Sequence, residues 1–171
     1  QTVMRFLDEL DISAKEVDAV NCIRIKNQES GIKIGYNTDI FGFEQSFKPF
    51  LKSHHTSALI LGTGGASKAV AYILDKSKIK FRYISRMADR KSKISNILSY
   101  SEINKKVIQE HLIIINTTPL GMFPNVNECP NIPYEYLTDK HFLYDLTYNP
   151  EETLFLKKGK EKGAQIKNGL E

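Results

Sequence analysis

The sequence has 171 residues, and 24 Lys and Arg against 20 Asp and Glu give it a formal net charge of +4. Hydrophobic residues make up 41% and charged residues 26%, which is typical of a globular chain and argues against a disordered one. Two cysteines and ten glycines argue against a disulfide scaffold and a collagen-like chain. No apolar run approaches the ~20 residues that span a bilayer. We therefore expect no membrane partner. Neither Cys22 nor Cys129 has a CxxC partner, so we expect a reducing, cytoplasmic compartment.

Two short helices are predicted at the start of the chain. Apolar residues at i, i+3, i+4 and i+7 predict a helix that begins at Val3 and ends at Leu10. Ser13 and Glu16 have the spacing of a capping box, which predicts a second helix over residues 14–18.

A hairpin and a further helix follow. Residues 20–26 and 32–36 are predicted strands, joined by turn residues. Apolar side chains at helical spacing come next, and we interpret them as core; they are Ile40, Phe43, Phe47 and Phe50. The polar residues 52–56 end this helix and form the predicted domain boundary.

From residue 57 onward, short apolar strands alternate with helices. The predicted strands are residues 57–61, 81–85, 107–109, 112–116 and 142–146. The predicted helices are residues 66–74, 91–98 and 151–162. Such alternation is typical of βαβ units around a parallel sheet, so the predicted fold class is α/β.

A glycine-rich turn lies between the first of these strands and its helix, in the run Leu61-Gly62-Thr63-Gly64-Gly65-Ala66-Ser67-Lys68-Ala69. Gly62 allows a tight turn, and Gly64 and Gly65 let the backbone approach a pyrophosphate closely. The helix that follows offers unpaired N–H groups and the positive end of its dipole to an anion. Ser67 stands at the third glycine of the usual fingerprint and is small enough for close helix–strand packing. The run predicts a dinucleotide site, and a plain strand-to-helix turn is the alternative.

The residues after the second strand indicate which dinucleotide binds. An NAD site usually has a carboxylate at this strand end, bonded to the ribose 2′-hydroxyl. Here the strand ends in Ser85-Arg86. Arg86 and Arg90 offer guanidinium groups that match a 2′-phosphate, which favours NADP over NAD. The alternative is that both arginines are ordinary surface charges.

Polar residues also follow two later strands. Because ligands of open α/β sheets bind beyond the carboxyl ends of the strands, we expect Asn116, Thr117 and Thr118 to line the cofactor crevice. The same argument applies to residues 145–148. For the first group, a polar turn stopped by Pro119 is the alternative.

Two further groups of residues do not indicate a function. The four histidines lack metal-ligand spacing, so no metal site is predicted, and His54 and His55 are expected to be solvated. The lysines of residues 157–162 are interrupted by Glu161 and have no aromatic platform beside them, so no nucleic-acid partner is expected.

Six segments of the chain, in their order and spacing, resemble the shikimate dehydrogenase family. They are Ala19-Val20-Asn21, Asn37-Thr38-Asp39, residues 62–69, residues 116–122, residues 144–150 and Asn168-Gly169-Leu170. The resemblance covers essentially the whole chain. It implies a Rossmann-type NAD(P)-binding parallel sheet domain at residues 57–165. Residues 1–52 would then be the remainder of an α/β substrate-binding domain, and residues 166–171 would start the return into it.

The resemblance implies an enzyme that reduces 3-dehydroshikimate to shikimate with NADPH, a step of aromatic amino-acid biosynthesis. The implied cofactor is NADP, the substrate is a small molecule, and a monomer or homodimer is expected. The family's substrate-binding positions match Asn21, Asp39 and Tyr148. Its cofactor-binding positions match Gly62, Thr63, Gly64, Gly65, Ala66, Ser67, Ser85, Arg86, Arg90, Asn116, Thr117, Thr118, Leu146 and Gly169.

The catalytic pair of the family is a lysine and an aspartate, in which the aspartate holds the ammonium group and the pair sets the pKa of the acid–base group. Asp39 matches the aspartate, whereas the lysine would lie just before Gln1 and is absent. We therefore expect a truncated enzyme that binds NADP(H) and turns over negligibly. Without the resemblance, Asp39 would be interpreted as a helix N-terminal residue. Ser85-Arg86-Met87 stands where the family has Asn-Arg-Thr.

Two alternatives stay open. One is a quinate/shikimate dehydrogenase that accepts NAD, which titration with NAD and NADP would distinguish. The other is a nucleotide-binding module that performs no chemistry, which the sequence before Gln1 would decide.

Overall fold

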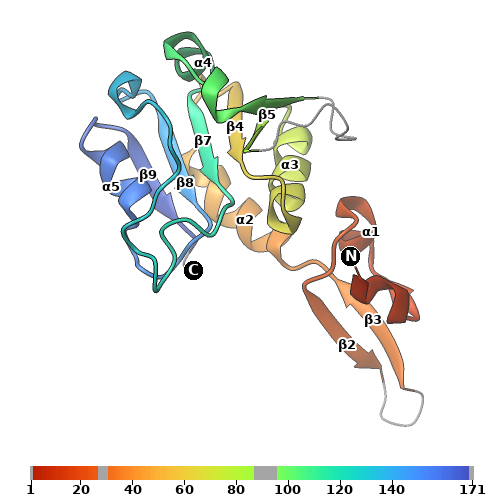
Figure 1. The fold of residues 1–171 in the computed structure, drawn as a ribbon. Coiled ribbons are helices and arrows are strands. Elements are labelled where there is room, and N and C mark those ends of the chain that lie inside the picture. Colours follow the sequence, from red (N-terminus) through yellow and green to blue (C-terminus); the bar gives the residue numbers. More distant parts are fainter. Residues whose placement is uncertain (1, 27–30, 87–95, 170–171) are drawn as a thin grey trace.

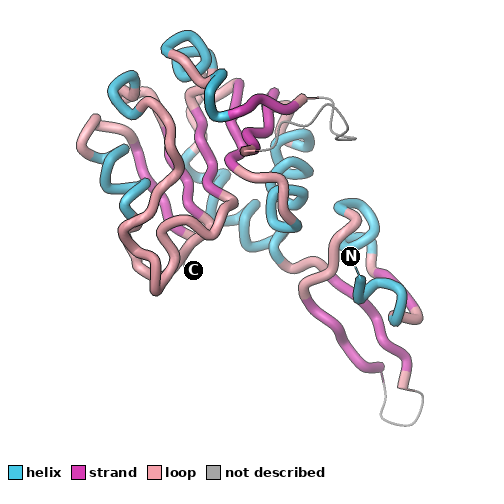
Figure 2. The backbone as a smooth tube through the Cα atoms, in the orientation of Figure 1, coloured by secondary structure: helices cyan, strands magenta, loops and turns pink. Residues whose placement is uncertain are grey.

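Two sheets organise the chain, and the helix α3 (Gly65–Lys76) lies between them (Figure 1). The fold was obtained as a computed structural model, which describes residues 2–26, 31–86 and 96–169. A six-stranded sheet with helices on both faces forms the larger body, and a three-stranded sheet forms a smaller lobe that projects from it (Figure 2). None of the helices in these ranges combines the length and the apolar character that a bilayer crossing requires.

The smaller sheet has β3 (Ile32–Tyr36) at its centre, with β2 (Cys22–Lys26) antiparallel and β1 (Glu9–Leu10) parallel to it. The predicted hairpin is therefore confirmed. The predicted helix from Val3 to Leu10 is wrong, because only Thr2–Phe6 is helical, as a 3₁₀ helix, and Leu10 lies in β1. The cause is Gly35, where a Cβ atom would lie 3.0 Å from the Leu10 side chain. Its absence lets this segment lie against β3 as a strand.

The next helix, α1 (Ile12–Val17), begins two residues earlier than predicted. Its N-cap is Asp11, whose Oδ1 accepts a hydrogen bond from the backbone N–H of Ser13 at 2.9 Å. The hydroxyl of Ser13 also donates to Asp11, and the two hydrogen bonds from Ser13 lower the pKa of the Asp11 carboxyl. Because Asp11 and not Ser13 is the N-cap, the helix begins at Ile12 and not at residue 14. The helix ends at Asp18, which has a left-handed backbone with φ of 48°.

The six strands of the larger sheet all run in the same direction. They are β4 (Ser57–Leu61), β5 (Lys80–Ser85), β6 (Ile97–Ser99), β7 (Ile113–Asn116), β8 (Phe142–Asp145) and β9 (Gln165–Asn168). The spatial order is β6-β5-β4-β7-β8-β9, and every neighbouring pair is parallel. The predicted parallel sheet is confirmed. Its order reverses between β4 and β7, which is where Rossmann-type sheets bind ligands.

Three elements of this body differ from the prediction. Residues 97 and 98 lie in β6 and not in a helix, while residues 91–95 of that predicted helix lie outside the described residues. The strand predicted at residues 107–109 is the helix α4 (Lys105–Glu110), because the Asn104 side chain accepts the Val107 N–H and caps it. The strand β9 was not predicted, since Gln165–Asn168 has a single apolar residue. It pairs with β8, so this part of residues 166–171 lies in the sheet.

Alternate residues of the central strands enter two hydrophobic clusters, one on each face of the sheet. Ile60 shares one cluster with α2 (Asp39–Phe47) and α3. Leu59 shares the other with α4 and α5 (Leu154–Lys160). Continuous apolar strands are what a parallel sheet covered on both faces requires.

The aromatic face of α2 is core, as predicted. Phe47 is fully buried, and its ring stacks on Phe142 of β8 with 5.6 Å between the centroids. Phe43 meets Tyr144 of the same strand edge-on at 5.1 Å. Thus α2 packs on the six-stranded sheet although it precedes the predicted boundary at residues 52–56. The division into domains stays a prediction.

Three buried histidines each precede a strand at the amino-terminal edge of this sheet: His55, His111 and His141. The expectation that His55 is solvated is wrong, since 4% of it is exposed. Its Nδ1 accepts the backbone N–H of Lys52 at 3.0 Å, which leaves Nε2 to donate to the carbonyl of Lys140 at 3.1 Å. Both ring nitrogens are thereby used by a neutral imidazole.

The free energy of unfolding is expected to decrease as the pH falls below about 6.5. Burial lowers the pKa of His55, His111 and His141, so the folded chain binds fewer protons than the unfolded chain. The contribution of these neutral histidines to the free energy of unfolding is fully present above their unfolded-state pKa. It is lost as the pH falls toward their lower folded-state pKa values. Each histidine contributes a slope of up to about 1.4 kcal/mol per pH unit. Urea unfolding over this pH range measures the slope.

His141→Gln tests the contribution of one buried histidine. This variant is expected to show a smaller slope than the unaltered chain, because glutamine does not titrate and His141 is 1% exposed. The same slope in the variant and in the unaltered chain would contradict this account.

Candidate dinucleotide site

The glycine turn lies at the carboxyl end of β4, directly at the point where the strand order reverses. Gly62 has a φ of +107°, a region that side chains rarely enter, and its N–H donates to the carbonyl of Ile84 on β5 at 2.8 Å. A Cβ atom on Gly62 would lie 2.9 Å from the Oγ1 of Thr117 and 3.1 Å from Thr118. Both the backbone and the close approach of the loop after β7 therefore require glycine here.

Gly62→Ala is expected to destabilise the fold by about 1–3 kcal/mol, because the left-handed backbone and the contact with Thr117 are both strained. Gly42→Ala is the matched control, since Gly42 lies in α2 and a Cβ atom there meets nothing within 4 Å. The control is expected to be neutral or more stable by up to about 1 kcal/mol. Urea unfolding measures both, and equal stabilities would show that Gly62 is not under constraint.

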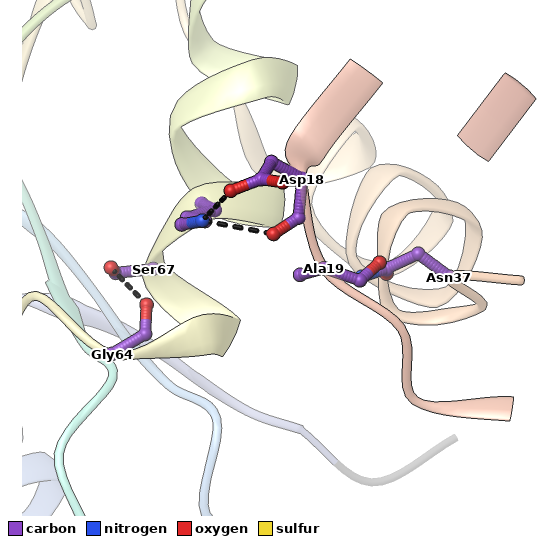
Figure 3. A network of polar contacts seen from close by, with 6 residues as sticks. Asp18, Ala19, Asn37, Gly64 and Ser67 are labelled. Atoms are coloured by element: carbon purple, nitrogen blue, oxygen red, sulfur yellow. Dashed lines mark hydrogen bonds and ion pairs between the residues drawn. The ribbon is translucent and has the colours of Figure 1, made fainter. Parts of the chain in front are cut away.

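Gly64 and Gly65 differ from Gly62, because nothing lies within 4 Å of where their Cβ atoms would be. Gly64 is the N-cap of α3, and no side chain caps the first turn of this described helix. The turn is closed from within by Ser67, which is buried and whose hydroxyl donates to the carbonyl of Gly64 at 2.6 Å (Figure 3). The open space and the uncapped N–H groups fit an anionic group such as a pyrophosphate.

A first cavity of about 580 Å³ opens on one side of the glycine turn. Its lining residues are Gly62, Thr63, Gly64, Ile84, Ser85, Arg86, Tyr100, Thr117, Thr118, Pro119, Leu120, Cys129 and Asn131. Arg86 and Tyr100 are neighbours because Ser85 of β5 pairs with Ser99 of β6. Burial raises the pKa of the Tyr100 phenol, and the charge of Arg86 partly opposes this rise.

A second cavity of about 460 Å³ opens on the other side of the turn. Its lining residues are Ala66, Thr117, Thr118, Pro119, Met122, Phe123, Leu146, Thr147, Tyr148 and Asn149. The two cavities share Thr117, Thr118 and Pro119, so the loop after β7 separates them. An elongated ligand that lies across this loop would reach both cavities.

A buried polar network holds the loop after β7 in place. Asn116 is fully buried and lines neither cavity, so the expectation that it lines the crevice is corrected. Its Nδ2 donates to Asp145 at 3.0 Å, and its Oδ1 accepts the hydroxyl of Thr118 at 2.6 Å. Asp145 also accepts from the Thr153 hydroxyl at 2.6 Å and the Thr147 N–H at 3.0 Å. Asn116 therefore shapes the loop whose threonines line the cavities.

The Asp145 carboxyl is fully buried, and this burial raises its pKa, while the hydrogen bonds from Thr153, Thr147 and Asn116 oppose the rise. A carboxyl without such donors would be costly in this position. The loops after β7 and β8 are thus joined beneath the second cavity by one acidic group.

The predicted substrate residues Asn21 and Asp39 lie together in the smaller lobe and at the start of α2. The Nδ2 of Asn21 donates to Asp39 Oδ1 at 2.6 Å, and the Oδ1 of Asn21 accepts the N–H of Thr38 at 3.0 Å. Both Asn21 and Asp39 are exposed, and neither lines the two cavities. Asp39 is also the first residue of α2, where the helix dipole favours a carboxylate.

The remaining predicted residues lie at the same edge of the sheet, with one exception. Tyr148 and Leu146 line the second cavity, and Tyr148 is 64% exposed. Gly169 follows β9, and a Cβ atom there would collide with the carbonyl of Leu146, so its backbone lies close to this cavity wall. Gly65 and Ser67 belong to the turn without lining a cavity. Arg90 lies outside the described residues.

Several cavity residues were not predicted. Tyr100 follows β6, and this strand was expected to be the end of a helix. Cys129 and Asn131 come from the loop between β7 and β8, whose path the sequence does not indicate. The parallel pairing of β5 with β6 would have identified Tyr100, because it follows that pairing directly.

The strand order, the glycine turn at the reversal point and the two adjoining cavities define a Rossmann-type domain with a candidate dinucleotide site. The chain matches no protein-family model. The NADP(+) shikimate dehydrogenase of Desulforamulus reducens is 37% identical over 190 residues, which cover 99% of this chain and 62% of that protein. The resemblance to the shikimate dehydrogenase family is therefore confirmed along almost the whole chain. The chain spans about 62% of the length of this curated relative.

Solved structures show the same likeness. The crystal structure of shikimate dehydrogenase from Aquifex aeolicus has a TM-score of 0.83 and 34% identity, and covers 99% of this chain and 62% of that chain. The quinate dehydrogenase from Corynebacterium glutamicum in complex with NAD has a TM-score of 0.82 and 27% identity, and covers 99% of this chain and 62% of that chain.

Proposed function

We propose that the chain is the cofactor-binding part of an NADP-dependent shikimate dehydrogenase, which reduces 3-dehydroshikimate to shikimate with NADPH. The observation that carries the proposal is the pair of glycines, Gly64 and Gly65, whose missing side chains leave open space at the start of α3, where Gly64 lines the first cavity. Relatives named NADP(+) shikimate dehydrogenase support the cofactor and the reaction. NADPH would supply the hydride for the reduction.

The proposed roles of the residues follow from their places. The N–H groups at the start of α3 would bind the pyrophosphate, because the helix dipole and the uncapped N–H groups attract an anion. Arg86 would bind the 2′-phosphate in the first cavity. Leu146 and Gly169 would bound the nicotinamide side, near the second cavity. Residues 57–165 would form this domain, with Arg90 as a further phosphate ligand.

Asn21 and Asp39 would orient the substrate hydroxyls, with Tyr148 facing the substrate from the second cavity. The Asn21 amide donates to the Asp39 carboxylate, which holds that carboxylate in one orientation. Asp39 could then hold the ammonium group of a lysine that acts as the proton donor. Residues 1–52 would contribute this part of the substrate-binding domain.

Calorimetry with NADP⁺ and NAD⁺ tests the cofactor assignment. Arg86→Gln is expected to weaken NADP⁺ binding about 10- to 100-fold and to leave NAD⁺ binding nearly unchanged, because the lost guanidinium–phosphate pair contributes ~1.5–3 kcal/mol. Arg82→Gln is the control on the same strand, since Arg82 is exposed and lines neither cavity. If Arg86→Gln weakens both dinucleotides equally, Arg86 does not recognise the 2′-phosphate.

A second candidate is a quinate/shikimate dehydrogenase that accepts NAD, and the likeness to the quinate dehydrogenase in complex with NAD supports it. Against it stands the end of β5, where the cavity is lined by Ser85 and Arg86 and where none of the described lining residues is a carboxylate. Tighter binding of NAD⁺ than of NADP⁺ in the same titration would favour this candidate.

A further inference from the structure

An ion pair connects the helix that follows the glycine turn to the lobe that carries Asn21. The Nζ of Lys68, in the first turns of α3, donates to the Oδ2 of Asp18 at 2.9 Å and to the backbone carbonyl of Asp18 at 2.9 Å (Figure 3). Asp18 follows α1 and has the left-handed backbone that ends this helix. One lysine therefore binds both the side chain and the main chain of the same residue. We refer to Lys68 and Asp18 as the clasp.

From the clasp, hydrogen bonds continue to the predicted substrate residues. The carbonyl of Ala19, the residue after Asp18, accepts a hydrogen bond from the Nδ2 of Asn37 at 3.1 Å. Asn37 is 5% exposed, and the next residue, Thr38, donates its N–H to the Oδ1 of Asn21. Asn21 in turn donates to Asp39. The hydrogen bonds therefore follow one another through adjacent or shared residues from Asp18 to Asp39.

The other end of the clasp reaches the glycine turn. Lys68 directly follows Ser67, whose hydroxyl closes the turn by donating to Gly64. Lys68 therefore belongs to the first turn of α3, the same turn whose backbone N–H groups would bind an anion. A ligand that orders this turn would also order Lys68, and through it the chain segment that leads to Asn21.

We propose that Lys68 is a positioning residue, which holds Asn21 and Asp39 in a fixed place relative to a dinucleotide bound at the glycine turn. The inference rests on the proposed function, since it needs a dinucleotide in that turn. The clasp is not needed for folding, because an exposed ion pair contributes only ~0–1 kcal/mol. Val17 of α1 is buried in the cluster that includes residues of α3, so the two helices stay packed without the clasp.

The test is the response of the Asn21 side-chain amide to NADP⁺, followed by ¹⁵N NMR on the whole chain. In the unaltered protein, saturating NADP⁺ is expected to shift the Asn21 amide and the Thr38 N–H signals. Lys68→Met is expected to reduce these shifts about threefold or more at saturation, because the two segments are no longer joined. Lys68→Arg keeps the donors and is expected to retain the shifts.

Lys76→Met is the matched control. Lys76 lies on the same helix and pairs with Glu44 at 3.2 Å, but at the far end from the glycine turn, so this variant is expected to keep the shifts. Unchanged shifts in Lys68→Met, or equal losses in both variants, would overturn the role of the clasp. Binding of NADP⁺ without any shift at Asn21 in the unaltered chain would also overturn it and leave the proposed function standing. Absence of NADP⁺ binding to the unaltered chain would instead remove the proposed function and the inference with it.

Discussion

Gly64→Val is expected to weaken NADP⁺ binding about 100-fold, because its side chain would occupy the space that a pyrophosphate needs and would separate it from the N–H groups of α3. The fold should tolerate the change. Gly64 has φ of −78° and ψ of −173°, which valine adopts readily, and its Cβ atom meets nothing within 4 Å. Valine is a poorer N-cap than glycine, but it also restricts the unfolded chain, so the net change in stability is expected to be below about 1 kcal/mol.

The matched control for Gly64→Val is Gly42→Val in α2. A Cβ atom on Gly42 also meets open space, but it lies away from the glycine turn, so the control should bind NADP⁺ as the unaltered chain does. Calorimetry measures the affinities, and urea unfolding confirms that both variants fold. If Gly64→Val folds and binds NADP⁺ with unaltered affinity, no pyrophosphate lies at this turn.

Asp145→Ala is expected to destabilise the chain by about 3–5 kcal/mol. The change leaves three buried donors without their acceptor: the hydroxyl of Thr153, the amide of Asn116 and the N–H of Thr147. Asp145→Asn keeps one acceptor oxygen in a side chain of nearly the same shape, so it is expected to lose less. The loss should be visible in urea unfolding as a lower midpoint.

Asp75→Ala serves as the control for Asp145. Asp75 is exposed at the end of α3, and its removal is expected to change the stability by less than about 0.5 kcal/mol. A similar small effect for Asp145→Ala would contradict the account, because it would mean that the loops after β7 and β8 do not depend on the buried carboxyl.

Much of the larger sheet could be predicted from the sequence. Strands such as β4 (Ser57–Leu61) and β7 (Ile113–Asn116) are buried on both faces, so they form continuous apolar runs that few other elements produce. The aromatic stripe of α2 was likewise readable, because its spacing places Phe43 and Phe47 on one helix face. These elements have strong local patterns that agree with their tertiary surroundings.

The elements that were missed depend on distant partners. The strand β9 is half-buried, with a single apolar residue, and is recognisable only by its pairing with β8. The segment ending at Leu10 has a helical spacing, but Gly35 has no side chain. This leaves room for Leu10 to lie against β3 and to pair with it as a strand. His55 precedes β4 in a polar stretch, and its burial comes from Phe142 and the Lys140 carbonyl, far along the chain.

In the candidate site, too, the features with local requirements were predicted and those that depend on distant partners were not. The glycine turn was predicted from its residues, because the conformation at Gly62 and the open space at Gly64 are local requirements. The place of Asn116 was not, because a polar residue at a strand end can face a ligand or a buried partner. Here the partner is Asp145, which is 29 residues away along the chain.

A crystal structure of the chain grown with NADP⁺ tests the central claim most directly. The account predicts the pyrophosphate on the N–H groups at the start of α3, with the 2′-phosphate beside Arg86 in the first cavity. The nicotinamide should then enter the second cavity, next to Leu146. A dinucleotide bound elsewhere, or a glycine turn left empty at saturating NADP⁺, would contradict the account.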